Sequence, residues 1–61
     1  MPIVRIELLA GRTKEQKAAA AKQITEVVQA TLGASPESTQ VIFTEVEKRH
    51  WAKAGVLFDP T

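Results

Sequence analysis

The second residue of the chain, Pro2, carries a nitrogen that could act as a catalytic base. Removal of Met1 would leave Pro2 with a free secondary amine, directly ahead of the strand-like run of residues 3–9. Because the proline ring fixes the backbone angle φ, an anchored strand would hold the nitrogen lone pair in one direction. Burial beside a positive charge lowers the pKa of an α-amino group from its ordinary value of about 7.7–8.0 towards neutral, where a general base works best. A proline at the start of a strand is also structurally ordinary, so the dipeptide alone leaves both roles open.

Length and composition restrict the chain to one small domain that a single copy would stabilise only marginally. A chain of 61 residues buries only about 60% of the surface that its unfolded form exposes. The sequence has no cysteine and a single histidine, which excludes disulfides and argues against a structural zinc site. Self-association is the remaining source of stability. We expect residues 1–61 to form one domain that assembles with copies of itself.

The charge and hydropathy patterns argue against two classes of partner. The net charge of +1 gives no electrostatic case for binding nucleic acid or an anionic membrane. Arg5 and Glu7 interrupt the first nine residues, and no apolar stretch approaches the roughly 18 residues of a membrane span. We therefore expect a soluble cytoplasmic protein with no nucleic-acid or membrane partner.

Two segments have the composition of β-strands. In residues 3–9 apolar side chains alternate with Arg5 and Glu7, while the second face is also partly apolar. A short turn around Pro36 precedes the second segment, residues 41–46, which is rich in β-branched and aromatic side chains. Both faces of the first strand are therefore expected to be covered.

The segment between these strands predicts one amphipathic helix. Thr13 and Gln16 have the spacing of a capping box, so the helix should begin near Lys14. Apolar residues then recur at helical spacing as far as Leu32, and Gly33 suits the left-handed residue that ends a helix. A helix between two strands implies a right-handed βαβ unit with a parallel strand pair.

We therefore predict an α/β fold, a single βαβ unit with two parallel strands, one helix and a C-terminal tail or hairpin. One helix covers only one face of a parallel pair, and a two-stranded sheet is marginal in water. The other face and the strand edges should be covered by other copies of the chain, so that oligomerisation completes the fold.

Several short segments, in their order and spacing, closely resemble the 4-oxalocrotonate tautomerase family. They are Pro2, Gly11-Arg12-Thr13, Glu15-Gln16-Lys17, Thr44-Glu45-Val46, and His50-Trp51 ahead of Gly55. The resemblance covers almost the whole chain. It implies small βαβ chains that assemble, typically as homohexamers, and that move protons on enols of 2-keto acids with no cofactor.

The resemblance also implies roles for individual residues. Pro2 matches the family's base, which takes the hydroxyl proton of a 2-hydroxydienoate and returns a proton to a carbon of the conjugated system. Arg12 matches the arginine that engages a substrate carboxylate or carbonyl, and we expect it to share a pocket with Pro2. Its planar fork suits that task. A cation just before a helix faces the positive end of the helix dipole, which anion binding would explain.

Three further residues are expected to line the substrate pocket. Trp51 falls where the family carries an aromatic side chain that lowers the dielectric around the proline amine. It could equally serve as an interface or core anchor, and both roles can coexist at a subunit boundary. Ile3 and Leu9 are the other two candidate lining residues.

The sequence departs from the family at Gln40, where the best-known members carry a second arginine that contacts the far carboxylate of a dicarboxylate substrate. An arginine–carboxylate hydrogen bond contributes about 1.5–3 kcal/mol, so its absence would cost roughly tenfold to a hundredfold on a dicarboxylate. Either Gln40 hydrogen-bonds a smaller or less charged group, or a nearby cation supplies the charge. The candidate cations are Arg5, Arg49 and Lys53.

Our interpretation is a tautomerase that acts on small-molecule enols of 2-keto acids, and two alternatives stay open. Related enzymes hydrate or dehalogenate unsaturated acids, which needs an activated water and usually an added carboxylate; Glu7, Glu45 and Glu47 are available. If Met1 is retained, the Pro2 nitrogen is a tertiary amide without a basic lone pair. The chain would then be a non-catalytic assembly module.

Overall fold

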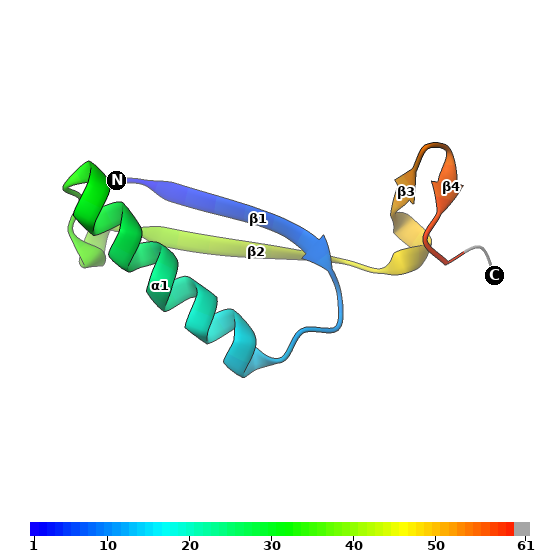
Figure 1. The fold of residues 1–61 in the computed structure, drawn as a ribbon, viewed down its shortest axis with the longest axis horizontal. Helices are drawn as coiled ribbons and strands as arrows, with labels where there is room; N and C mark the ends of the chain where they lie inside the picture. Colours follow the sequence, from blue (N-terminus) through cyan, green and yellow to red (C-terminus); the bar gives the residue numbers. More distant parts are fainter. Residues whose placement is uncertain (60–61) are drawn as a thin grey trace.

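The computed structural model describes residues 1–59, which form a βαβ unit followed by a short hairpin (Figure 1). The main elements are strand β1 (Ile3–Leu9), helix α1 (Lys14–Leu32) and strand β2 (Gln40–Val46). One 3-10 turn, Pro36–Ser38, precedes β2 and a second, Lys48–His50, follows it. The hairpin consists of β3 (Ala52–Lys53) and β4 (Val56–Leu57). The predicted order of strand, helix, strand and tail is confirmed.

Strands β1 and β2 pair in parallel along their whole length. The register joins Ile3 to Gln40 at one end and Leu9 to Val46 at the other. Beyond the last pair, the Ala10 N–H donates to the Val46 carbonyl at 2.9 Å. Parallel strands need a crossover connection, and α1 provides it. The predicted parallel pair is confirmed.

Local sequence signals determine both ends of α1. The Thr13 hydroxyl accepts a hydrogen bond from the Gln16 N–H at 3.0 Å, and the Gln16 side-chain oxygen accepts one from the Thr13 N–H at 2.9 Å. At the other end Gly33 has φ 72°, and its N–H donates to the Gln29 carbonyl at 3.1 Å. Glycine adopts this left-handed conformation without a steric cost. No helix within residues 1–59 has the length and apolar character needed to cross a membrane.

Helix α1 covers one face of the sheet and leaves the other face open. Alternation along the strands places the covered side chains against α1, namely Val4, Ile6, Leu8, Val41 and Phe43. Among residues 1–59 the only buried apolar residue is Val28, which is 9% exposed. Val27 and Leu32 belong to the predicted apolar side of the helix but stay 58% and 72% exposed, because a sheet of two strands is too narrow to cover that side.

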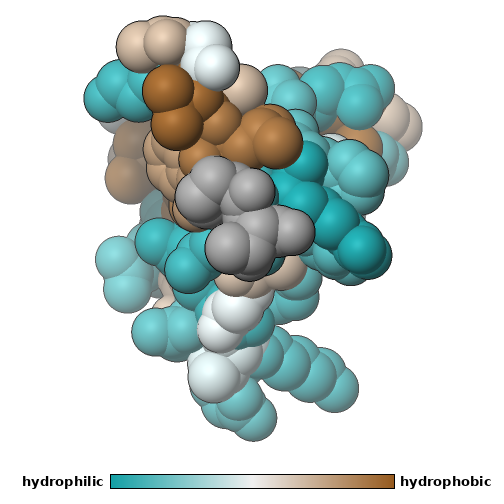
Figure 2. All heavy atoms as spheres, turned by 90° about the vertical axis from the view of Figure 1, so that its right-hand side faces the viewer, coloured by the Kyte–Doolittle hydropathy of each residue, from teal (hydrophilic) through white to brown (hydrophobic). Residues whose placement is uncertain are grey.

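The C-terminal hairpin lies beyond the end of β2, at the opposite end of the molecule from the N-terminus (Figure 1). This arrangement gives residues 1–59 an elongated shape, with extents of 45 × 23 × 14 Å. Trp51 packs against Phe58 with ring centroids 6.2 Å apart, and the Phe58 N–H donates to the Trp51 carbonyl at 2.8 Å. Figure 2 shows apolar side chains gathered at this end of the molecule. A single copy therefore leaves apolar surface exposed on the hairpin and on the open face of the sheet.

Candidate active site

Three of the predicted site residues lie together at the start of the two strands, which we call the amino edge (Pro2, Ile3 and Gln40). The Gln40 N–H donates to the Pro2 carbonyl at 3.0 Å. Ile3 and Gln40 are register partners, so their side chains share one face of the sheet. The covered side chains occupy the other face, and Ile3 is 48% exposed. The amino edge therefore presents Pro2, an aliphatic side chain and an amide on the side away from α1.

Backbone pairing fixes the position of Pro2, while Met1 lies outside the strand. Met1 is 82% exposed, and its sulfur accepts a weak contact from the Gln40 side-chain nitrogen at 3.4 Å. Since Met1 makes no pair in the β1–β2 register, its removal would leave that register unchanged. The ring of Pro2 would then hold a secondary amine at the open start of β1.

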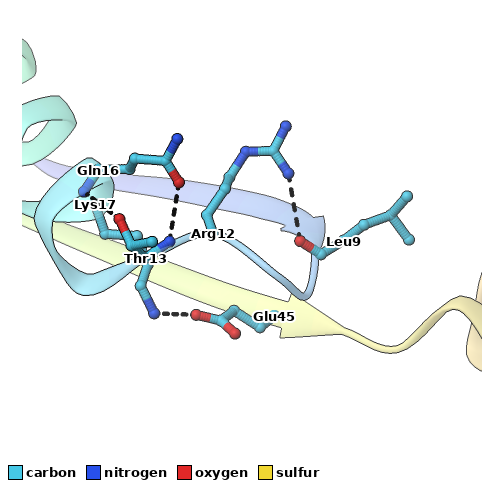
Figure 3. Close-up of polar contacts among 6 residues, drawn as sticks. All are labelled: Leu9, Arg12, Thr13, Gln16, Lys17 and Glu45. Atoms are coloured by element: carbon cyan, nitrogen blue, oxygen red, sulfur yellow. Dashed lines mark hydrogen bonds and ion pairs between the residues drawn. The ribbon is translucent and has the colours of Figure 1, made fainter.

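Leu9 and Arg12 lie at the other end of the sheet, which we call the carboxyl edge (Leu9 to Lys17, with Glu45). The guanidinium of Arg12 donates to the Leu9 carbonyl at 3.5 Å (Figure 3). Lys17, in the first turns of α1, forms an ion pair with Glu45 on β2 (Figure 3). The side chains of this ion pair are only 30% and 34% exposed. Side-chain contacts therefore link the loop, the helix and β2 at this edge.

A cavity of about 350 Å³ lies between α1 and the sheet at the carboxyl edge. Its lining is mostly apolar, with polar side chains contributed by the loop and the first turns of α1. The lining residues are Ile6, Leu8, Arg12, Gln16, Lys17, Ala20 and Phe43. Arg12 and Lys17 thus border the same space, on the covered side of the sheet.

The two edges are too far apart for Pro2 and Arg12 to meet within one chain. Pro2 precedes β1 and Arg12 follows it, with a seven-residue strand between them. At about 3.3 Å per residue, this strand separates the two residues by roughly 20 Å. A single chain therefore does not bring the predicted base and the predicted carboxylate-binding arginine into one pocket.

The structure also places the other candidate residues. Trp51 lies between β2 and the hairpin, at the opposite end from Pro2 in the same chain, and packs on Phe58. Arg49 pairs with Glu47 at 2.8 Å, and Lys53 lies in the hairpin. Within one chain, only Arg5 among the three candidate cations shares a strand with the amino edge.

Sequence reasoning missed two contacts of the site region. It identified Lys17 and Glu45 as parts of a motif without pairing them, although alternation on β2 places Glu45 and Phe43 on the same side. It also left Phe58 without a role, whereas this residue packs on Trp51.

No group of three or more potential metal-ligating side chains occurs within residues 1–59.

Comparison with known proteins identifies the family. A family model described as tautomerase enzyme matches residues 2–59, so the chain belongs to the tautomerase family. The 2-hydroxymuconate tautomerase of Bacillus subtilis (strain 168) is 46% identical over 55 residues, covering 90% of this chain and 89% of that protein. The predicted resemblance is confirmed, and the chain has a tautomerase-type function.

Solved structures agree with this assignment. A crystal structure of a 4-oxalocrotonate tautomerase homologue has a TM-score of 0.91 at 38% identity, covering 95% of this chain and 92% of its own. A heterohexamer 4-oxalocrotonate tautomerase from Chloroflexus aurantiacus J-10-fl has a TM-score of 0.88 at 31% identity, with 95% and 94% covered. The βαβ fold with a C-terminal hairpin is therefore the fold of this family.

Proposed function

We propose that this protein interconverts the enol and keto forms of 2-keto acids without a cofactor, and that Pro2 is the base once Met1 has been removed. One observation carries the proposal. Pro2 stands at the open start of β1 with its carbonyl fixed by the Gln40 N–H, and the adjacent Met1 is exposed. The identity with a 2-hydroxymuconate tautomerase supports an enol of this chemical class as the substrate.

The proposed reaction is a proton transfer that one nitrogen performs twice. The neutral amine of Pro2 accepts the hydroxyl proton of a 2-hydroxydienoate, and electrons move into the conjugated system as the keto group forms. The resulting ammonium then returns a proton to a carbon of that system, which regenerates the base. A positioned general base of this kind contributes roughly 10²–10⁴ in rate. Arg12 binds the substrate carboxylate through its planar fork.

We further propose that each active site combines residues from more than one copy of the chain. About 20 Å of strand separates Pro2 and Arg12 within one copy. The open sheet face and the hairpin carry the apolar surface that an assembly would bury, including Ile3, Val56 and Leu57 at 48%, 63% and 43% exposure. The proposed assembly is a homohexamer, with the same number of subunits as the related Chloroflexus enzyme, which is described as a heterohexamer, but with every subunit a copy of this chain.

In such an assembly Trp51 and Leu9 line the pocket around a Pro2 from another copy, while Ile3 and Gln40 line it from the same copy. The hairpin supports this role for Trp51, because it projects beyond the sheet and is held by the contact with Phe58. Gln40 lies beside the N-terminus, so its amide would face the substrate next to the base.

No observation favours the hydratase or dehalogenase alternative. Such an enzyme needs a carboxylate that is available to activate water. Glu45 and Glu47 are engaged in ion pairs with Lys17 and Arg49. Only Glu7 of the three candidates makes no ion pair within the part of the chain that the structure describes, and it lies on the exposed side of β1.

The deciding experiment compares protein that retains Met1 with the same protein after treatment with a methionine aminopeptidase. Intact mass identifies the two forms, and light scattering checks that both form the same multiple of 6.7 kDa. We expect ketonisation of 2-hydroxymuconate to fall at least about a hundredfold when Met1 is present, because an amide nitrogen is not basic. In the processed form the rate should rise with pH, since only the neutral amine accepts a proton. Equal activity of the two forms would exclude Pro2 as the base and favour a non-catalytic role for the N-terminus.

A further inference from the structure

Glu45 lies at the carboxyl edge, close to the loop that carries Arg12. It pairs in register with Leu8, and the next residue of β2, Val46, accepts a hydrogen bond from Ala10 in that loop. Its carboxylate pairs with Lys17, which borders the same cavity as Arg12. A carboxylate therefore lies at the same edge as the arginine that we propose for substrate binding, with Glu45 turned toward Lys17 and Arg12 turned toward Leu9 (Figure 3).

Arg12 itself contacts no carboxylate within residues 1–59. Within the described part of the chain its guanidinium makes one polar contact, a 3.5 Å hydrogen bond to the Leu9 carbonyl, which is at the limit of a useful bond. A guanidinium has five donors and binds carboxylates in a bidentate geometry. Arg12 could therefore take up a substrate carboxylate, and it could equally take up the side chain of Glu45 if that side chain were released.

The position of Lys17 in α1 does not by itself favour a positive charge. Lys17 is the fourth residue of α1, and positive charge near the start of a helix is unfavourable because of the helix dipole. The ion pair with Glu45 offsets this cost, and its partial burial reduces screening by salt. We therefore attribute the presence of a lysine at position 17 to its ion pair with Glu45.

We propose that Lys17 is a positioning residue that holds Glu45 away from Arg12 and thereby keeps Arg12 free for the substrate carboxylate. The proposal rests on the proposed function, in which Arg12 binds that carboxylate. Without Lys17, the Glu45 carboxylate becomes an intramolecular competitor for Arg12. The substrate then has to displace an ion pair before it can bind.

The test is a double-mutant cycle made of Lys17→Met, Glu45→Gln and the double variant, with kcat and KM measured on 2-hydroxymuconate. Methionine keeps the apolar stem of the lysine, so packing is changed little. We expect Lys17→Met to raise KM about threefold to fivefold, as a partly buried ion pair of about 0.7–1 kcal/mol would require, with kcat nearly unchanged. Glu45→Gln should leave KM within twofold, and the double variant should return KM to that level.

A matched control removes a lysine from the same helix. Lys22 lies on the exposed side of α1 and forms no ion pair within the described chain, so Lys22→Met should leave KM unchanged. Thermal unfolding and light scattering are compared for all variants. Should Lys17→Met not fold, Lys17→Gln serves in its place, because glutamine is also uncharged and favours helix.

Three results would overturn the proposal. If Glu45→Gln lowers KM by as much as Lys17→Met raises it, the two charges act independently on the substrate through their electrostatic fields, without competition for Arg12. If all three variants raise KM, the ion pair is a structural link between α1 and β2. If Lys17→Met leaves KM unchanged, Glu45 does not compete for Arg12. A different result, an Arg12→Gln variant that leaves KM unchanged, would contradict the proposed function itself.

Discussion

The two ends of the β1–β2 sheet hold their candidate residues in different ways. At the amino edge, main-chain pairing alone positions the candidate base, through the bond between the Gln40 N–H and the Pro2 carbonyl. At the carboxyl edge, the main-chain bond from the Ala10 N–H to the Val46 carbonyl is supplemented by side-chain contacts that position the loop carrying Arg12. These contacts are the Thr13 capping box and the Lys17–Glu45 ion pair.

This difference bears on how each edge would respond to mutation. A backbone nitrogen fixed by strand pairing depends on the fold as a whole and on the state of the N-terminus. An arginine on a loop depends on individual side chains, each of which can be changed alone. Each edge, and the separation between the two, can therefore be tested by its own substitution.

The largest effect is expected when a Pro2 variant and an Arg12 variant are mixed, because the intact amino edge and the intact carboxyl edge of one site can then come from different copies. Pro2→Ala keeps a small fraction of the activity, because processing still exposes a primary amine, and Arg12→Gln binds substrate poorly. If each site combines Pro2 of one copy with Arg12 of another, unfolding and refolding an equal mixture restores both residues at about a quarter of the sites, by random assortment in a symmetric oligomer. Initial rates before and after mixing measure this gain.

Two controls accompany the mixing experiment. Each variant is refolded alone, and light scattering checks that both parents and the mixture form the same oligomer. A mixture that shows only the average of its parents would mean that one copy supplies both residues. That result would contradict the separation of about 20 Å along β1.

The second-largest effect is expected when Arg12 alone is substituted. We expect Arg12→Gln to raise KM for carboxylate substrates about tenfold to a hundredfold, because a charge-assisted hydrogen bond contributes about 1.5–3 kcal/mol. Arg12→Lys should recover part of this loss, since it keeps the charge without the planar fork. Lys14→Gln removes a neighbouring cation at the same helix start and should change KM less than threefold. An equal loss in Lys14→Gln would show that the carboxyl edge acts through its net charge.

Sequence and structure agree where the determining contacts are local. The ends of α1 follow from Thr13, Gln16 and Gly33, all within a few residues of the helix termini, and the parallel pairing follows from the order of the elements. The Lys17–Glu45 pair joins residues 28 positions apart, so it depends on how β2 is aligned with α1. Sequence spacing alone does not give that alignment.

The arrangement of the candidate site shows the same limit. The sequence identified Pro2 and Arg12 as candidates that share a pocket, without showing whether one copy of the chain or two would supply them. The length of β1 separates them, and only the register shows that Gln40 lies beside the N-terminus while Trp51 lies at the other end. Candidate residues could be selected through the family resemblance, whereas their separation within one copy required the strand pairing.

The smallest effect is expected at Gln40, which tests whether the amino edge faces the far end of the substrate. Gln40 lies next to Met1 and pairs with Ile3 on the open face, so an arginine there would add a cation near the base. Gln40→Arg should raise kcat/KM for 2-hydroxymuconate relative to phenylenolpyruvate about threefold to tenfold. The range extends down to threefold because an exposed arginine loses side-chain entropy when it binds the carboxylate, which offsets part of the gain. Gln40→Met, which has similar length and no charge, is the control and should leave the ratio unchanged. If Gln40→Arg changes both substrates equally, position 40 does not contact the distal carboxylate, and the charge that binds a dicarboxylate must come from the carboxyl edge or the hairpin of another copy.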